Sequence, residues 1–284
     1  MATRLRQHGR LAGFAAALLA IASSLWAQQI ALSVSPPLVE MVVAPGGDRT
    51  FQVTLTNDGD TVFQARAQVA DLALDQEGNA VTQPAGTSPW SLSRWVTLSD
   101  GNLAVRPGQQ KTVRCRVRVP LGQAGGRYGA VLFAVQRSAE MAGSGMRLET
   151  RTGTVLMLTV AHTERRKAEV GDFRVRRADS TTGDVVFEVG LRNTGNAHLR
   201  ATGEVLVRDA ANRIAARLRL DGGKGTVLPD GVRVFAARLS RPRLGPGTYR
   251  AEARFSAPGL RAVTGKRDFA VDQSGEILAA PAGS

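Results

Sequence analysis

Few side chains in this sequence could carry out catalysis. The chain has three histidines and one cysteine, and a nucleophile needs a neighbouring base to become reactive. Neither His162 nor His198 stands in a recognisable nucleophile, base or metal-binding motif, so each is expected to be a solvated or capping residue. The pattern around Cys115 turns it inward as a small core residue, and a buried thiol is a poor nucleophile. The sequence therefore predicts a protein that is not an enzyme and has no catalytic residue or cofactor.

One acidic segment has the chemistry of a calcium site. Asp71, Asp75, Glu77 and Asn79 place four oxygen-bearing side chains in one predicted loop, and carboxylate and amide oxygens are the ligands that Ca²⁺ takes. Their spacing does not reproduce an EF-hand loop, and Glu77-Gly78-Asn79 is typical of a hairpin turn. The turn is the favoured interpretation, and no metal site is predicted.

Arginines and tryptophans are the remaining candidates for binding. Arg114, Arg116 and Arg118 alternate with apolar residues, so they should form a ladder on the exposed face of one strand. That ladder is either a solvated face or a stripe that binds anions. Trp90 and Trp95 could line a carbohydrate groove, but packing against the core or a strand edge is favoured for Trp95.

The elements that must position these side chains are strands. Apolar and polar residues alternate from Ile30 to Val271, as in Phe51, Val53 and Leu55, and helical periodicity is almost absent. Turn motifs rich in Gly, Pro, Asn and Asp separate about seven short runs in each half of the chain. This pattern is typical of a β-sandwich. The predicted fold is all-β, with two tandem immunoglobulin-like β-sandwich domains after a signal peptide.

The two halves also share turn motifs in the same order. Residues 56–60 match residues 192–196, and residues 105–108 match residues 227–231. A weak internal duplication is the simplest explanation.

The first residues predict export. Arg4, Arg6 and Arg10 precede an apolar run over residues 11–25 that ends near Ala27, which is the layout of a secretory signal peptide. The run is too short to cross a membrane, and no later apolar stretch offers an integral membrane segment. The predicted divisions are a signal peptide at 1–27, an N-terminal domain at 28–163, a C-terminal domain at 164–272 and a disordered tail at 273–284.

The strong positive charge indicates which classes of partner the protein could bind. The formal net charge is +13, and removal of the leader takes away three arginines. A basic surface outside the cytoplasm favours anionic envelope polymers or acidic proteins over nucleic acid. Arginine supplies nearly all of this charge, which GC-rich coding alone would also produce.

Several short motifs resemble those of two families of envelope proteins. The N-terminal half resembles the first domain of PapD-type periplasmic pilus-assembly chaperones. The residues that carry this resemblance are Ser35-Pro36-Pro37, Pro45-Gly46-Gly47, Leu55-Thr56-Asn57-Asp58-Gly59, Val105-Arg106-Pro107-Gly108 and Tyr128. It also resembles the N-terminal domain of WxL-interacting surface proteins, through Trp95-Val96-Thr97-Leu98 and residues 125–133.

The chaperone resemblance implies β-strand addition to a pilin, with two basic residues holding the pilin carboxylate. The first-strand arginine has no equivalent near Pro36, and residues 152–158 contain no lysine. Arg147 and Arg151 are the nearest candidates for displaced anchors, and Met146 and Leu148 are the two apolar side chains offered at the edge. Two such anchors make strand addition marginal unless the partner supplies more.

The WxL resemblance implies binding of surface proteins and peptidoglycan. Proteins of that family carry a C-terminal membrane segment, and no such segment is expected here before Ser284. The sequence thus predicts a non-catalytic periplasmic chaperone-like protein that binds pilin or another secreted subunit. The alternative is a cell-envelope adaptor that binds surface proteins or an anionic polymer. The candidate partner-binding residues are Met146, Arg147, Leu148, Arg151, Arg114, Arg116 and Arg118.

Overall fold

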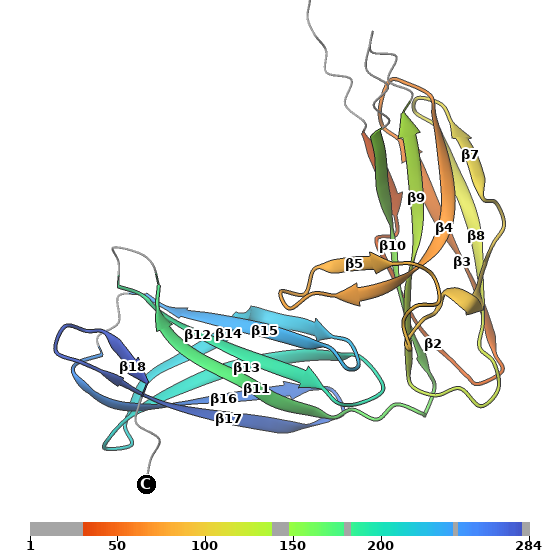
Figure 1. The fold of residues 1–284 in the computed structure, drawn as a ribbon. Coiled ribbons are helices and arrows are strands. Elements are labelled where there is room, and N and C mark those ends of the chain that lie inside the picture. The colour runs from red at the N-terminus through yellow and green to blue at the C-terminus, as the bar shows by residue number, and fades with distance from the viewer. Residues whose placement is uncertain (1–30, 138–147, 179–182, 241–243, 280–284) are drawn as a thin grey trace, which may run out of the picture.

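The structure, a computed structural model, describes residues 31–137, 148–178, 183–240 and 244–279. The predicted signal peptide lies outside these residues, as do Met146 and Arg147. Two β-sandwiches follow one another along the chain and meet at an angle (Figure 1). The prediction of an all-β protein with two sandwich domains is confirmed. The described residues include no helix that could span a lipid bilayer.

The first sandwich contains a four-stranded and a six-stranded sheet. The four-stranded sheet has the order β1 (Leu32–Ser35), β3 (Asp48–Asn57), β8 (Gln110–Arg118) and β6 (Val96–Leu98). The six-stranded sheet has the order β2 (Leu38–Val43), β10 (Leu148–Val160), β9 (Gly126–Arg137), β4 (Phe63–Leu74) and β5 (Ala80–Gln83), with β7 (Asn102–Val105) also paired to β4. A single turn of 3₁₀ helix, Ser93–Trp95, precedes β6.

The chain changes sheets at its first strand. β1 pairs antiparallel with β3, and β2 pairs parallel with β10. Pro36 and Pro37 form the crossover between them, after a cis Ser35–Pro36 bond. The continuous segment of β1 and β2 therefore supplies an edge strand to each sheet of the first sandwich.

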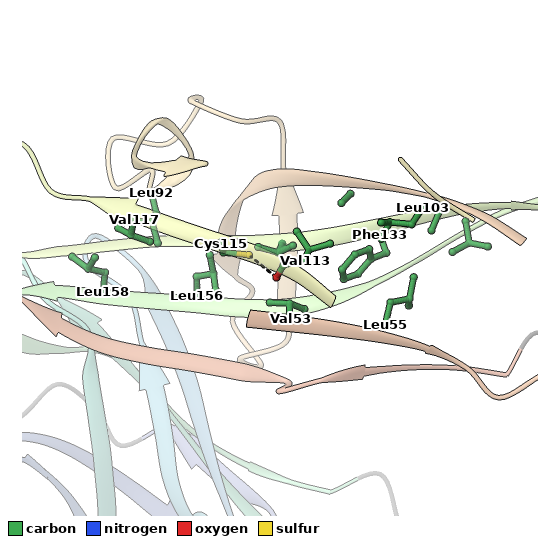
Figure 2. Packing of buried hydrophobic residues seen from close by; sticks show 14 of the residues in the cluster. Val53, Leu55, Leu92, Leu103, Val113, Cys115, Val117, Phe133, Leu156 and Leu158 are labelled. Atoms are coloured by element: carbon green, nitrogen blue, oxygen red, sulfur yellow. Dashed lines mark hydrogen bonds between the residues drawn. The ribbon is translucent and has the colours of Figure 1, made fainter. Parts of the chain in front are cut away.

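Alternation along the strands builds the first core. Inward-facing residues of β3, β8 and β10 meet between the sheets, and Figure 2 shows Val53, Cys115 and Leu156 there. Cys115 is fully buried, as predicted, and burial raises the pKa of its thiol to about 11. Trp95 packs partly buried against this core, which is the favoured sequence interpretation.

The second sandwich repeats the plan with a three-stranded and a five-stranded sheet. The first has the order β11 (Ala168–Arg177), β12 (Val185–Asn193) and β15 (Val232–Leu239). The second has the order β14 (Ile214–Val227), β13 (Leu199–Asp209), β16 (Gly247–Ala257), β17 (Leu260–Val271) and β18 (Ile277–Ala279). Phe187, Phe235, Phe255 and Phe269 fill its core.

The turns matched between the two halves make the same contacts. The Asn57 side-chain amide donates to the carbonyls of Thr61 and Val105, at 2.8 and 3.1 Å. The Asn193 amide donates to Ala197 and Val227, at 2.8 and 2.9 Å. Both asparagines are buried, and their Oδ1 atoms accept the N–H of the residue two positions later. The motif shared by the halves is therefore a buried asparagine whose side chain bonds the backbone of the turn, once in each domain; we call it the asparagine clamp.

The expectation of a disordered tail from residue 273 is wrong for part of that segment. Ile277–Ala279 form β18, which pairs antiparallel with residues 269–271 of β17. Asp272 stabilises the intervening turn by accepting the N–H groups of Ser274 and Glu276. Ile277 then packs against the second core. Residues 280–284 lie outside the described part of the chain.

Candidate binding site

The first half of β10 is an open sheet edge. β9 pairs with β10 along its length, from Leu148 to Thr159, whereas β2 pairs only with Val155–Val160. Among the described residues, no strand pairs with this edge from Leu148 to Thr154. We call this segment the β10 edge.

The direction of the backbone groups on the β10 edge follows from one bond. The N–H of Val155 donates to the carbonyl of Pro37, at 2.9 Å, on the β2 side. Successive residues of a strand point their backbone groups to alternate sides. The N–H and C=O groups of Glu149, Arg151 and Gly153 therefore project from the β10 edge, ready to pair with an added strand.

Side chains divide the β10 edge into an inner and an outer face. Thr154 points inward with Leu156 and Leu158, and its hydroxyl donates to the carbonyl of Pro36 at 2.7 Å. Glu149 and Arg151 point outward and pair with each other at 2.6 Å. They border a polar hollow of about 490 Å³ on the outer face, which β4, β7, β9 and β10 line together.

The candidate residues from the sequence fall on two different sheets. Arg151 and the backbone of Leu148 belong to the β10 edge, whereas Arg114, Arg116 and Arg118 belong to β8 in the opposite sheet. All three β8 arginines are exposed, in the ladder that the alternation predicts. The structure does not bring the two groups together, so they define two separate surfaces.

The edge of β15 provides a contrast within the same molecule. The tip of the β4–β5 hairpin reaches the second domain (Figure 1), and the N–H of Val234 donates to the carbonyl of Gln76 at 2.8 Å. The next outward N–H, that of Ala236, donates to the carboxylate of Asp221 at 2.7 Å. Two outward N–H groups of this edge thus already donate hydrogen bonds to other parts of the chain.

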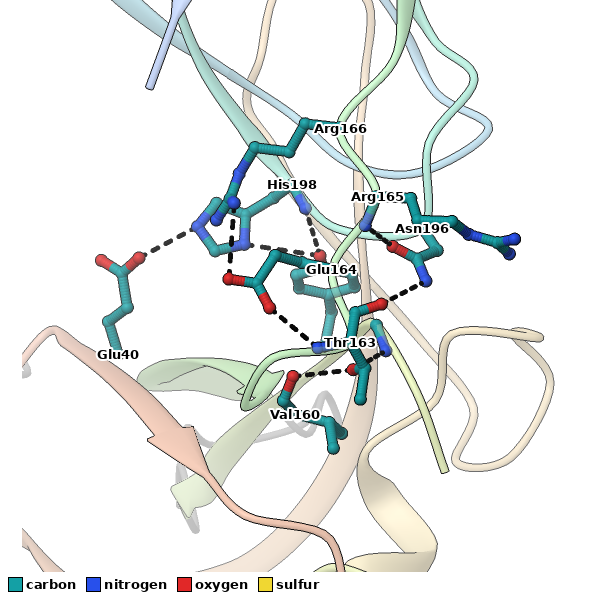
Figure 3. Close-up of polar contacts among 10 residues, drawn as sticks. Glu40, Val160, Thr163, Glu164, Arg165, Arg166, Asn196 and His198 are labelled. Carbon is teal, nitrogen blue, oxygen red and sulfur yellow. Dashed lines mark hydrogen bonds and ion pairs between the residues drawn. The ribbon is translucent and has the colours of Figure 1, made fainter. Parts of the chain in front are cut away.

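A polar cluster centred on the buried Tyr128 and His198 joins the two domains. The phenolic oxygen of Tyr128 accepts the backbone N–H of His198 at 2.6 Å, and the His198 Nε2 lies 2.9 Å from Glu40 (Figure 3). Glu40 also pairs with Arg200, at 2.5 Å. We call Glu40, Tyr128, His198 and Arg200 the junction cluster. The expectation of a solvated or capping His198 is wrong, because the first domain covers the ring and leaves it 7% exposed.

Asn196 fixes the connecting segment beside this cluster. Its Oδ1 accepts the N–H of Arg165 at 2.5 Å, its Nδ2 donates to the Thr163 carbonyl at 3.1 Å, and its own carbonyl accepts the N–H of Gly126 at 2.6 Å. Gly125 has a φ of +78°, and a side chain there would collide with Asn196. Gly125 and Gly126 therefore allow the close approach of the two domains.

The tryptophans serve the junction and the first domain. Trp90 donates from Nε1 to Asp230 of the second domain at 2.8 Å. The guanidinium of Arg127 lies over the rings of both Trp90 and Trp95, at 5.6 and 5.0 Å from their centroids. These partners favour packing over a carbohydrate groove for both rings.

The acidic segment does not form one loop. Asp71 is buried within β4, where its carboxylate accepts from the N–H of Ser88 and the hydroxyl of Ser91. Asp75 instead accepts from the backbone and side chain of Asn79 across the hairpin turn. In the described part of the chain, no three His, Cys, Asp or Glu side chains are grouped closely enough to hold a metal ion.

The protonation of the junction cluster follows from the burial of His198 and Tyr128 and from the hydrogen bonds to Glu40. Burial lowers the pKa of His198, although the hydrogen bond to Glu40 opposes this shift, and Arg200 and Arg166 add to it. Burial alone would raise the pKa of Glu40, but hydrogen bonds from Arg200 and His198 outweigh it and leave that pKa lowered. The neutral imidazole therefore donates from Nε2 to an ionised Glu40. Burial also raises the pKa of Tyr128.

These shifts predict a loss of stability in mild acid. The unfolded chain takes up the His198 proton near pH 6.5, whereas the folded protein takes it up at lower pH. The stability that neutral His198 contributes is thus full above about pH 6.5 and falls as the pH drops below it. We expect the melting temperature to fall between pH 7.5 and 5.5, and to fall less in His198→Gln.

The second histidine of the described chain is the matched control. His162 is exposed and has a φ of 59°, a conformation that asparagine tolerates. His162→Asn removes the other described histidine without touching the junction cluster, so its pH slope is the one against which His198→Gln is compared. Equal pH slopes in His198→Gln and the unmodified protein would contradict the assignment to His198.

Comparisons with known proteins return structures only. No family model matches the chain, and no curated protein matches it. The chain is similar to one from a chaperone–tip adhesin complex of CFA/I fimbriae, with a TM-score of 0.45 and 6% identity over 83% of this chain and 98% of that one.

Two further solved structures are similar at the same level. One is a chaperone–tip adhesion subunit pre-assembly complex, CsuC–CsuE, of archaic Csu pili from Acinetobacter baumannii (TM-score 0.40, 11% identity, 83% of this chain and 97% of that one). The other is the SafA pilin in complex with the SafB chaperone from Salmonella enterica (TM-score 0.40, 10% identity, 84% of this chain and 96% of that one).

Proposed function

We propose that this protein is a non-catalytic, periplasmic chaperone-like protein that holds an extended segment of pilin or another secreted subunit. The segment adds as a strand to the β10 edge. The observation that carries the proposal is that β10 continues for several residues beyond its pairing with β2. Export follows from the predicted signal peptide.

Open edges are normally protected, because an unpaired row of N–H and C=O groups invites pairing with another chain. The protein protects its β15 edge with Gln76 and Asp221. The β10 edge has no comparable cover among the described residues. This difference supports a binding role for the β10 edge, since main-chain pairing to a sheet edge is a common mode of peptide recognition.

Backbone pairing alone would not hold the segment. Three outward-facing residues offer up to six hydrogen bonds, each contributing a net of about 0.5–1.5 kcal/mol. Ordering about five partner residues costs roughly 5–10 kcal/mol of backbone entropy. The two terms nearly cancel, so affinity must come from side chains that the partner buries.

The inner face is where such side chains would pack. β1 lies beside β10 (Figure 1), and its Leu32 and Val34 are only partly buried against the first core. Inward-facing side chains of an added strand would lie between them and the threonines of the β10 edge. A partner segment with alternating apolar residues fits this arrangement.

Proline at position 151 tests the proposal. The Arg151 N–H faces outward, so Arg151→Pro removes one donor and blocks the edge while the neighbouring bonds to β9 remain. Strand addition should weaken at least about tenfold, because a lost bond and a steric block act together. The measurement is capture of periplasmic polypeptides by the purified protein, followed by titration of the segment identified.

Arg151→Gln is the matched control, since it removes the same charge and keeps the N–H. It should bind within about twofold of the unmodified protein, because the exposed ion pair of Arg151 with Glu149 contributes little; a larger loss would instead assign Arg151 the anchor role that the sequence predicts. If Arg151→Pro and Arg151→Gln bind equally well, the β10 edge is not the site. Capture of no polypeptide by any variant would argue against the chaperone-like function itself.

A further inference from the structure

The outer surface of the four-stranded sheet is wholly polar. Alternation turns Val113, Cys115 and Val117 of β8 into the core, and each is fully buried. The residues between them face outward, together with the outward residues of β1, β3 and β6. We call this surface the β8 face; its members are Ser33, Ser35, Asp48, Thr50, Gln52, Thr54, Thr56, Thr97, Gln110, Thr112, Arg114, Arg116 and Arg118.

Three arginines dominate the charge of the β8 face. Arg116 pairs with Asp48 at 3.0 Å, in the open, with 61% of its side chain exposed. Arg114 and Arg118 form no ion pair with any described residue, and both are exposed. Asp100 lies at the border, where it accepts from the Ser99 hydroxyl. The face thus keeps an excess of positive charge with two guanidinium groups available.

Hydroxyl and amide groups flank two of the three guanidinium groups. The strand register places Gln52 opposite Arg114, and Thr50 and Thr97 on either side of Arg116, whereas Arg118 lies opposite Asp48. Side chains on one face of a strand repeat at roughly 7 Å, so the arginines form a regular row. A guanidinium donates two parallel hydrogen bonds to a carboxylate.

The same features favour a polar polymer over a protein or a membrane. The centre of a protein interface combines Arg with Trp and Tyr anchors, and amphipathic segments hold a membrane surface with inserted apolar groups. The outward-facing residues of the β8 face include arginine but no aromatic or apolar side chain. A flat row of arginines among hydroxyls and amides instead matches a chain of acidic sugars, which carries carboxylates and hydroxyls in a regular repeat.

We propose that the β8 face binds an acidic polysaccharide that runs along β8. Its carboxylates pair with Arg114 and Arg118, and its hydroxyls bond to the adjacent threonine and glutamine side chains. The site is independent of the proposed strand addition, because the β8 face and the β10 edge belong to different sheets. The protein would then hold a subunit on one layer and an envelope polysaccharide on the other.

Binding of alginate, a polyuronate, tests the proposal. Purified protein should bind alginate and not dextran, its neutral counterpart. Binding should weaken as the salt concentration rises from 0.1 to 1 M, which shortens the Debye length from about 10 to about 3 Å. Combined replacement of Arg114, Arg116 and Arg118 by glutamine should raise the dissociation constant at least about fivefold.

Three exposed arginines of the second domain form the matched control. Replacing Arg254, Arg261 and Arg267 by glutamine removes the same net charge from another surface, and binding should change less than about twofold. Circular dichroism melting checks that both triple variants are folded. If the triple variant of the β8 face is not folded, single replacements of Arg114 and Arg118 take its place. Each single replacement should weaken binding about twofold.

Three results would overturn the proposal. The first is equal weakening in the two triple variants, which would indicate a net-charge effect. The second is no binding to alginate, or equal binding to dextran. The third is arginine-dependent binding to phosphatidylglycerol vesicles in place of alginate, which would identify a lipid headgroup as the anion.

Discussion

Replacing Asn193 with alanine should lower the free energy of unfolding of the second domain by about 3–5 kcal/mol. The substitution removes three hydrogen bonds and leaves the carbonyls of Ala197 and Val227 and the N–H of Gly195 without that partner. Asn193 is fully buried, so water does not replace the lost bonds. Each unsatisfied buried group costs about 1–3 kcal/mol. Urea denaturation followed by circular dichroism measures the change.

The equivalent asparagine of the first domain, Asn57, allows the same test to be repeated. Asn57→Ala removes the equivalent bonds in the first domain and should cost a similar amount. Asn102 is exposed at the start of β7, so Asn102→Ala should stay within about 0.5 kcal/mol of the unmodified protein. A loss below about 1 kcal/mol in either clamp variant would show that the shared motif does not hold these turns together.

Replacing Tyr128 with phenylalanine should loosen the junction between the domains and cost about 1–3 kcal/mol. The ring and its apolar packing remain, but the buried N–H of His198 loses its acceptor. The contact between the Tyr128 hydroxyl and Nδ1 of His198, at 3.4 Å, is lost as well. Cleavage at residues 161–167 by a protease should become faster, because these residues connect the domains and depend on the junction for order.

The second tyrosine of the chain gives the matched control. Tyr249 donates its hydroxyl to the carbonyl of Gly245 at 2.8 Å in an exposed position. Tyr249→Phe should therefore change stability by less than about 0.5 kcal/mol and leave the cleavage rate unaltered. Equal effects of the two substitutions would contradict a special role for Tyr128 at the junction.

The sequence predicts the strands well because their period fixes which side chains face inward. Cys115, turned toward the core by its neighbours, and the exposed arginines of β8 both follow from alternation alone. The asparagine turns were also recognisable, since they recur in the same order in both halves. Local pattern and turn chemistry thus specify each sandwich.

The junction could not be predicted in the same way. Glu40 and His198 are 158 positions apart, and nothing in either local pattern indicates that they meet. The burial of His198 is a property of how two domains pack, so its turn sequence suggests a solvated residue. The β10 edge is similar: the alternation of β10 predicts a strand, but only the tertiary arrangement shows where β2 stops covering it.

The crossover at Pro36 and Pro37 limits how far along β10 an added strand can pair. Beyond it, β2 already occupies the row that a guest would enter, in parallel with the second half of β10. A guest can therefore pair with β10 only as far as Thr154, where the pairing with β2 takes over. To reach further it would have to displace β2 and open the first core. The host itself thus fixes the point at which pairing with a longer polypeptide must stop.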